Sequence, residues 1–250
     1  MPLPDVSHLR NYGVAFSEAE GAWSPEVKAT MRRVGKNVVM RHLSLMQKLR
    51  FFWRFTRAQR RASELDLSDL RARGMTNGAF LDQQLEYLAM FAALAEVLGT
   101  GKAVCVMQAV MDESAREPLR LALPEAEGLA AFDDPLQAWR AYVSPAPQAA
   151  RVAGCQELVI VEDGPDAVQF DVKWCVWLEL ARKMGVPEGC LPNCYSDDLV
   201  FPEFFAALGI RYRRTGTLAQ GAACCDFRFE RLPREAEPPR QATPPTPRTP

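Results

Sequence analysis

The sequence predicts an α+β fold in which N-terminal helices pack on a small antiparallel sheet made of two hairpins with interleaved helices. Two observations lead to this prediction. Up to about residue 142, apolar side chains recur at spacings of three and four, which is typical of helices. From residue 156 onward, short alternating segments are separated by turn residues, as in β-hairpins. The 250 residues, of which 48% are hydrophobic, are enough for a sizeable buried core.

Four helices are expected in the N-terminal part, and they span about residues 26–61, 79–98, 103–116 and 135–142. Gly35 is a candidate point at which the first helix divides in two. The second helix ends at Gly99 and the third at Pro118, because glycine favours helix ends and proline cannot continue a helix. Residues 117–135 are expected to form a loop.

The C-terminal part is expected to contain strands at residues 156–162, 167–172, 210–218 and 222–230, and helices at 173–184 and 196–208. The first two strands pair across the turn at 163–166, and the last two pair across 219–221. Gly185 ends the first of the two helices and Gly209 the second.

One α+β domain is therefore expected over residues 1–231. It comprises a basic helical segment (1–75), a helical half (76–150) and a half with the sheet and the site (151–231). Residues 232–250 contain seven prolines and few apolar side chains, so this tail is expected to be disordered. No apolar run reaches the roughly 18 residues of a membrane span, and no secretory signal is visible, so a cytoplasmic location is expected.

The net charge of −1 hides a segregation of charge along the chain. Between Lys28 and Ala62 there is no acidic residue, and the eleven basic ones are Lys28, Arg32, Arg33, Lys36, Arg41, Lys48, Arg50, Arg54, Arg57, Arg60 and Arg61. The favoured interpretation packs the aromatic run Phe51-Phe52-Trp53 into the core and pairs the arginines with acidic residues of this chain or of a second copy, as in a homodimer. The alternatives are an anionic membrane surface or nucleic acid, for which no known motif is present.

Seven cysteines are present, and five of them fall between residues 175 and 225. They are Cys105, Cys155, Cys175, Cys190, Cys194, Cys224 and Cys225. In a reducing compartment a disulfide framework is not expected. Three interpretations of the cysteines remain open: metal ligands, a reactive thiol and buried apolar side chains. Cys105 and Cys155 are interpreted as core. The alternative of a zinc site would use Cys190, Cys194 and Cys225.

Cys194-x-x-Asp197 places a thiol and a carboxylate one turn apart at a helix start. The helix dipole and free amides there favour a thiolate, whereas the carboxylate suits proton transfer, helix capping or substrate binding. The two histidines offer little to catalysis, because His8 lies in the N-terminal arm and His42 lies on an apolar stripe that favours the core.

These pieces, in this order, resemble the L-2-amino-thiazoline-4-carboxylic acid hydrolase family. The resemblance covers residues 75–231, most clearly from 155. It rests on Cys175 opening a helix, Gly185 ending it, Cys194-Tyr-Ser-Asp197, Arg211-Tyr-Arg-Arg214 and the hairpin Thr217-Leu-Ala-Gln-Gly-Ala-Ala-Cys-Cys-Asp-Phe227. Cys224 and the long basic helix depart from the family pattern. A weaker similarity links the same half to vinyl-reductase-type ligand-binding domains.

The resemblance implies a hydrolase that needs no cofactor and opens a C–N bond in a small cyclic amidine or thiazoline. Such a reaction needs a nucleophile, a proton-transfer group and a cation for the substrate carboxylate. The candidate nucleophile is Cys194 or Cys175. The candidate proton-transfer group is Asp197 or Asp226, with Cys225 beside them. The candidate cation is Arg211, Arg213 or Arg214. Trp174 and Tyr195 are further candidate substrate contacts. The alternative function is a ligand- or zinc-binding module without turnover. Each of these residues also has a purely structural interpretation, as a core residue, a helix cap or part of a solvated strand face.

Overall fold

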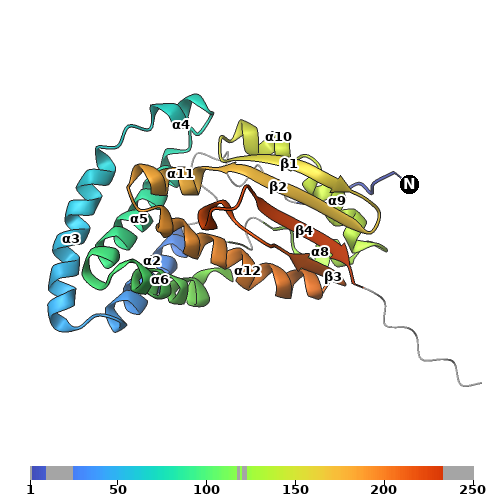
Figure 1. The fold of residues 1–250 in the computed structure, drawn as a ribbon. Coiled ribbons are helices and arrows are strands. Elements are labelled where there is room, and N and C mark those ends of the chain that lie inside the picture. The colour runs from blue at the N-terminus through green and yellow to red at the C-terminus, as the bar shows by residue number, and fades with distance from the viewer. Residues whose placement is uncertain (1, 10–24, 117–118, 120–122, 233–250) are drawn as a thin grey trace, which may run out of the picture.

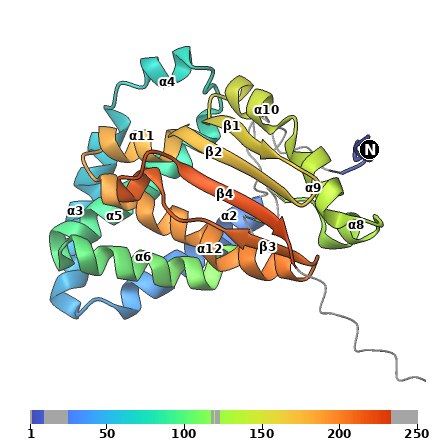
Figure 2. The ribbon, with the colours of Figure 1, turned by 45° about the vertical axis from the view of Figure 1, so that its right-hand side comes forward.

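The computed structural model describes residues 2–9, 25–116, 119 and 123–232. A helical layer, made mainly by the first half of the chain, packs beside one sheet (Figures 1 and 2). The described helices of the first half are α2 (Pro25–Arg41), α3 (Leu45–Ser63), α4 (Ser68–Ala72), α5 (Gly78–Leu98), α6 (Thr100–Ser114), α8 (Ala126–Ala130), α9 (Pro135–Val143) and α10 (Ala146–Val152). The later helices are α11 (Val176–Lys183) and α12 (Leu191–Ala206). Within the described residues, no helix has the length and apolar character needed to cross a membrane.

The sheet has four antiparallel strands in the order β1-β2-β4-β3, formed by Gln156–Asp163, Ala167–Cys175, Cys225–Arg231 and Ile210–Arg213 respectively. The central pair places Phe170 opposite Phe227, and their rings stack with centroids 5.1 Å apart. On β4, Phe229 is fully buried against Phe205 of α12 and Trp139 of α9. Alternating apolar residues on the strands thus form the face that the helices cover. The predicted α+β class is confirmed.

Most predicted elements of the first half are present, but the first helix divides at a different place. Gly35 lies inside α2, and the chain turns at residues 42–44. There Ser44 caps α3: its side chain accepts a hydrogen bond from the Gln47 amide, while the Gln47 side chain accepts one from the Ser44 amide. His42 lies in this turn and is exposed, so the expectation that it packs in the core is wrong.

Three short helices were not predicted. α4 and α10 join longer elements, and α8 lies in the segment expected to be a loop. Gly154, after α10, adopts φ +64°, and a Cβ there would lie 2.3 Å from the Met75 nitrogen. The second hairpin also has shorter strands than expected, because residues 214–224 form a connection that contains a 3₁₀ turn at Leu218–Gln220. Pro118 and the tail from residue 233 lie outside the described residues.

The aromatic run on α3 does not pack as favoured from the sequence. Phe51 is buried and stacks on Phe55, with ring centroids 5.7 Å apart. Phe52 and Trp53, by contrast, are 52% and 61% exposed. The core interpretation is therefore wrong for these two residues, because α3 is an outermost helix with only one covered face (Figure 1). Cys105, interpreted as core, is also exposed, whereas Cys155 is buried.

Candidate active site

A cavity of about 750 Å³ lies between the sheet and the helices, and apolar side chains form most of its wall. Polar and thiol groups that the sequence singled out reach it from several elements. They are Cys175, Cys190, Cys194, Asp197, Arg214 and Cys225. All seven cysteines of the chain are free thiols. The fold therefore brings four of them to one space.

Each of these thiols has its position because an element begins or ends there. Cys175 ends β2 and is the N-cap residue of α11, with extended backbone angles. Cys190 is the N-cap residue of α12, and Cys194 follows one turn later. Cys225 is the first residue of β4, which pairs with β2. The antiparallel pairing of β2 with β4 therefore joins sites that are 50 residues apart in the sequence.

The Cys175 thiol has a pKa below its usual value. The largest cause is a hydrogen bond from Cys190, and the backbone amides of Leu178 and Trp177 in the first turn of α11 act in the same direction. Burial and the charge of Asp197 oppose these effects without cancelling them. A helix N-terminus beside a thiol donor is a setting that favours a thiolate. Of the cysteines with a lowered or raised pKa, Cys175 is the one suited to be a nucleophile.

Two neighbouring thiols, Cys190 and Cys225, have a raised pKa, which favours the protonated form. The pKa of Cys190 is raised well above its usual value because of hydrogen bonds with Cys175 and Cys194, with burial adding to the effect. Burial raises the pKa of Cys225 to about 12, although its sulfur accepts a hydrogen bond from the Leu218 amide at 3.2 Å. Cys190 and Cys225 are therefore less suited than Cys175 to be a nucleophile.

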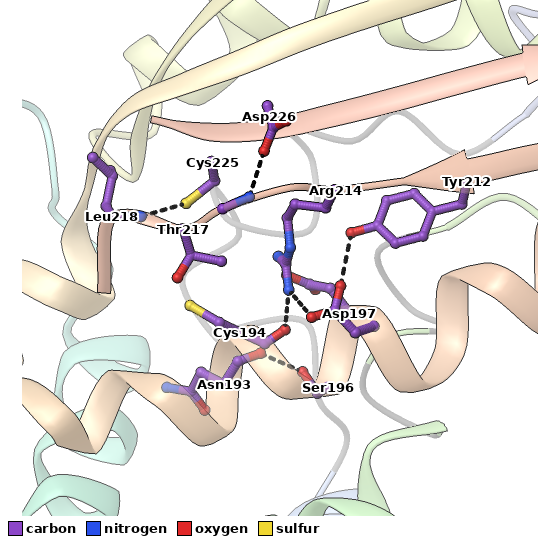
Figure 3. Close-up of polar contacts among 12 residues, drawn as sticks. Asn193, Cys194, Ser196, Asp197, Tyr212, Arg214, Thr217, Leu218, Cys225 and Asp226 are labelled. Atoms are coloured by element: carbon purple, nitrogen blue, oxygen red, sulfur yellow. Dashed lines mark hydrogen bonds and ion pairs between the residues drawn. The ribbon is translucent and has the colours of Figure 1, made fainter. Parts of the chain in front are cut away.

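Arg214 extends from the segment after β3 to the α12 helix (Figure 3). Its side chain is only 2% exposed, and its Nη1 lies 2.8 Å from Asp197 Oδ2. Its Nη2 lies 2.7 Å from Asp198 Oδ2 and also donates to the carbonyl oxygen of Cys194. The guanidinium further lies over the Phe227 ring, 5.0 Å from its centroid. One buried cation therefore fixes the α12 turn that carries both the thiol and the carboxylate.

Burial raises the pKa of Asp197 to about 6, because the ion pair with Arg214 only partly offsets the cost of removing the carboxylate from water, and the Asp198 charge adds to the rise. A carboxyl group with this pKa can both accept and release a proton near neutral pH. Tyr212 donates a hydrogen bond to Asp198 Oδ1 at 3.3 Å and so orients the second carboxylate of the cluster.

A model of the L-2-amino-thiazoline-4-carboxylic acid hydrolase family matches residues 82–229, which is more than half of the chain. The chain belongs to this family. The match runs from α5 to β4 and so includes every residue of the cluster around Arg214. No curated protein and no solved structure shows significant similarity to the chain.

In this member of the thiazoline hydrolase family, Asp226 is engaged outside the cavity lining. Its carboxylate accepts hydrogen bonds from the Thr215 amide, the Thr215 hydroxyl and the Gly216 amide, at 2.9, 2.6 and 2.9 Å. Burial would raise the pKa of Asp226, but these bonds outweigh it and lower the pKa. Asp226 therefore anchors the connection that positions Arg214, and it is absent from the cavity lining.

The other predicted substrate contacts also lie away from the lining of the cavity. Arg211 and Arg213 lie 3.5 and 3.4 Å from Glu230 on the neighbouring strand. Trp174 stacks under the guanidinium of Arg73, and Tyr195 donates to Asp112 at 2.7 Å. Arg211 and Arg213 share a side of β3 because side chains alternate along a strand, and this explains why both lie near Glu230. Their proposed substrate contacts find no geometric support.

Several lining residues were missed by sequence reasoning. Asn193 and Ser196 of α12 flank Cys194, and the Ser196 hydroxyl donates to the Asn193 carbonyl at 2.6 Å. Tyr87 of α5 donates to the Gly189 carbonyl at 3.1 Å, and burial raises its pKa well above the usual value. The apolar pattern of residues 79–98 marked α5 as core without showing that Tyr87 faces the thiols.

The alternative zinc site receives no geometric support. Across the described ranges, no group of three or more cysteine, histidine, aspartate or glutamate side chains is arranged to hold a metal ion. What the family member does present is a thiol with a lowered pKa, a carboxyl group with a raised pKa and a buried arginine at one cavity. This combination suits addition of a nucleophile to an electrophilic carbon with proton transfer to the leaving atom.

Proposed function

We propose that the chain hydrolyses a C–N bond in a small cyclic amidine or thiazoline, of the kind represented by 2-aminothiazoline-4-carboxylate. The observation that carries this proposal is the convergence of Cys175, Asp197 and Arg214 on one cavity. Family membership supports the reaction class, and the free thiols fit a cytoplasmic location, where they stay reduced.

The proposed nucleophile is the thiolate of Cys175. Its lowered pKa raises the thiolate fraction near neutral pH, and the amides at the start of α11 lie beside the sulfur. The Cys190 thiol donates toward it and keeps it in place. Cys194, the other candidate, sits one turn into α12 rather than at the residue that begins the helix. We therefore assign attack to Cys175 and a lining role to Cys194.

Asp197 is the proposed proton-transfer group. With a pKa of about 6, the carboxyl group gives its proton to the leaving ring nitrogen, and the carboxylate so formed accepts the proton released when water attacks. Arg214 is fully engaged by Asp197, Asp198 and a carbonyl, so we assign it to positioning Asp197 rather than to holding the substrate carboxylate. The amide side chain of Asn193, which lines the cavity, is the proposed polar contact for the substrate.

The proposed reaction adds one water in two steps. The Cys175 sulfur bonds to the amidine carbon, Asp197 gives a proton to the ring nitrogen, and the C–N bond breaks. Water then adds to the same carbon, its proton returns to Asp197, and the thiolate leaves. The product is the open-chain carbamoyl compound, and both catalytic groups end in the state in which they began.

The test is incubation of the purified protein with 2-aminothiazoline-4-carboxylate, followed by mass spectrometry for a product heavier by one water. We expect turnover by the wild type and by Cys105→Ala, whose thiol is exposed on α6, and none by Cys175→Ala or Asp197→Asn. Substrate binding without product would favour a ligand-binding module and overturn the proposal. Full activity of Cys175→Ala would remove that thiol from the mechanism.

A further inference from the structure

The outward face of α3 carries an apolar stripe that none of the described residues covers. Its side chains are Leu45, Met46, Leu49, Phe52 and Trp53, with exposed fractions of 76%, 63%, 62%, 52% and 61%. The buried residues of the same helix, Phe51, Ala58 and Ala62, point to the opposite side of the helix at helical spacing. Figures 1 and 2 both place α3 at the outer edge of the helical layer, far from β3.

Basic side chains border this stripe. The sequence from Lys28 to Ala62 contains no acidic residue. Arg54 pairs with Glu96 of α5 at 2.7 Å, and it also lies over the Trp53 ring. Among the residues that the structure describes, no carboxylate pairs with Arg50, Arg57 or Arg61. The exposed face of α3 is therefore apolar along its first half and cationic along its flank.

We propose that α3 docks this protein on the surface of an anionic lipid membrane, with the apolar stripe inserted at the level of the headgroups. A helix that combines an exposed Leu, Met, Phe and Trp face with a flank of arginines matches both parts of such a surface. The tryptophan ring favours the interface between water and lipid. Phe52 also lines the cavity, so the bound protein would hold the cavity close to the bilayer.

Charge and composition favour lipid over other occupants. A symmetric contact between two copies through α3 would bring two basic faces together, and like charges repel. Nucleic acid would meet the arginines, but it offers nothing to Leu45, Met46 and Leu49, which dominate the outer face. The membrane contact follows from α3 alone and does not depend on the proposed hydrolysis.

Binding is measured by sedimentation of the full-length protein with phosphatidylcholine vesicles, with and without about one-third phosphatidylglycerol, since binding requires anionic lipid. We expect binding to the anionic vesicles alone. It should weaken between about 10 mM and about 150 mM salt, as the screening length falls from about 30 Å to about 8 Å.

Two double variants separate the contributions, and neither touches the cavity lining. Arg50→Gln/Arg57→Gln should weaken binding about thirtyfold, from roughly fivefold per cation. Leu49→Asn/Trp53→Asn should abolish it while shifting the unfolding transition only slightly, because both side chains are exposed. The control is Arg151→Gln/Val152→Asn on α10, which removes one exposed cation and one exposed apolar side chain at a site away from α3 and should bind as the wild type does.

Any of the following results would overturn the proposal. The first is failure of the wild type to sediment with anionic vesicles at low salt. The second is binding by Leu49→Asn/Trp53→Asn at the wild-type level, because the apolar stripe would then be irrelevant. The third is a stable dimer in solution that Leu49→Asn/Trp53→Asn dissociates, or retention of an RNA or DNA oligonucleotide in preference to anionic vesicles. Vesicle binding and ring hydrolysis are read separately, so either can fail without the other.

Discussion

Replacing Arg214 with methionine is the sharpest perturbation of the site. The guanidinium is 2% exposed, and it makes charged hydrogen bonds to Asp197 and Asp198 on α12. Methionine keeps much of the volume but removes the charge and all the donors. Asp197 would then remain in the cavity wall without its cation. Such a group is costly, because an ionised carboxylate away from water needs a partner.

The expected loss of folding free energy is about 3–5 kcal/mol, which is the usual cost of removing one partner of a buried ion pair. Asp197 carries most of this loss, because Asp198 is 50% exposed and water can replace its bond to arginine. With a typical dependence on urea, the unfolding midpoint should fall by about 1–2 M. The matched control is Arg213→Met. Its side chain is 58% exposed and faces Glu230, so its loss should stay below about 1 kcal/mol.

The pH dependence identifies the cause of this loss. Burial already raises the pKa of Asp197 to about 6 from 3.8, so stability from this group is present below pH about 4 and is lost as the pH rises through 6. Without Arg214 the pKa rises further, so Arg214→Met should lose more stability at pH 8 than at pH 5. Adding Asp197→Asn should restore part of the loss at pH 8. A loss that is equal at both pH values, and strictly additive with Asp197→Asn, would refute the reasoning.

Three further predictions concern individual residues. Iodoacetamide should alkylate Cys175 faster than Cys225 near neutral pH, because the lowered pKa of Cys175 gives more thiolate. Peptide mass spectrometry measures the order of alkylation, and faster alkylation of Cys225 would contradict the prediction. Asp226→Asn should cost about 1–3 kcal/mol in urea unfolding, because it weakens the bonds to Thr215 and Gly216; an unchanged midpoint would contradict that role. Ser44→Ala should cost about 1 kcal/mol through loss of the α3 cap, and no shift in the thermal midpoint would argue against it.

Much of the fold could be predicted from local signals. The hairpin of β1 and β2 followed from alternation and the turn at 163–166, and α5 and α6 followed from their apolar periodicity. The pairing of β2 with β4 is a contact between distant segments, and no local pattern specifies it. Gly35 marks a candidate division of the first helix because glycine has low helix propensity, but the Ser44 capping box and the turn before it decide the position.

The site was predictable in its chemistry and not in its geometry. Cys194 and Asp197 are candidates from their position near a predicted helix start, and Cys175 is a candidate from the family pattern. The sequence does not separate the two thiols, because it cannot show which amides face a sulfur. Three arginines near β3 looked equivalent, and only Arg214 follows the end of the strand and turns toward α12. For α3, periodicity predicts an apolar stripe but does not distinguish a covered face from an exposed one.

The most direct test of the account is to trap the covalent intermediate. Wild-type protein and 2-aminothiazoline-4-carboxylate are mixed, quenched in acid within the first turnovers, digested and analysed by mass spectrometry. The account predicts a substrate-derived adduct on the peptide that contains Cys175 and none on the peptides with Cys105 or Cys225. Turnover without an adduct on Cys175, together with full activity of Cys175→Ala, would contradict its assignment as the nucleophile.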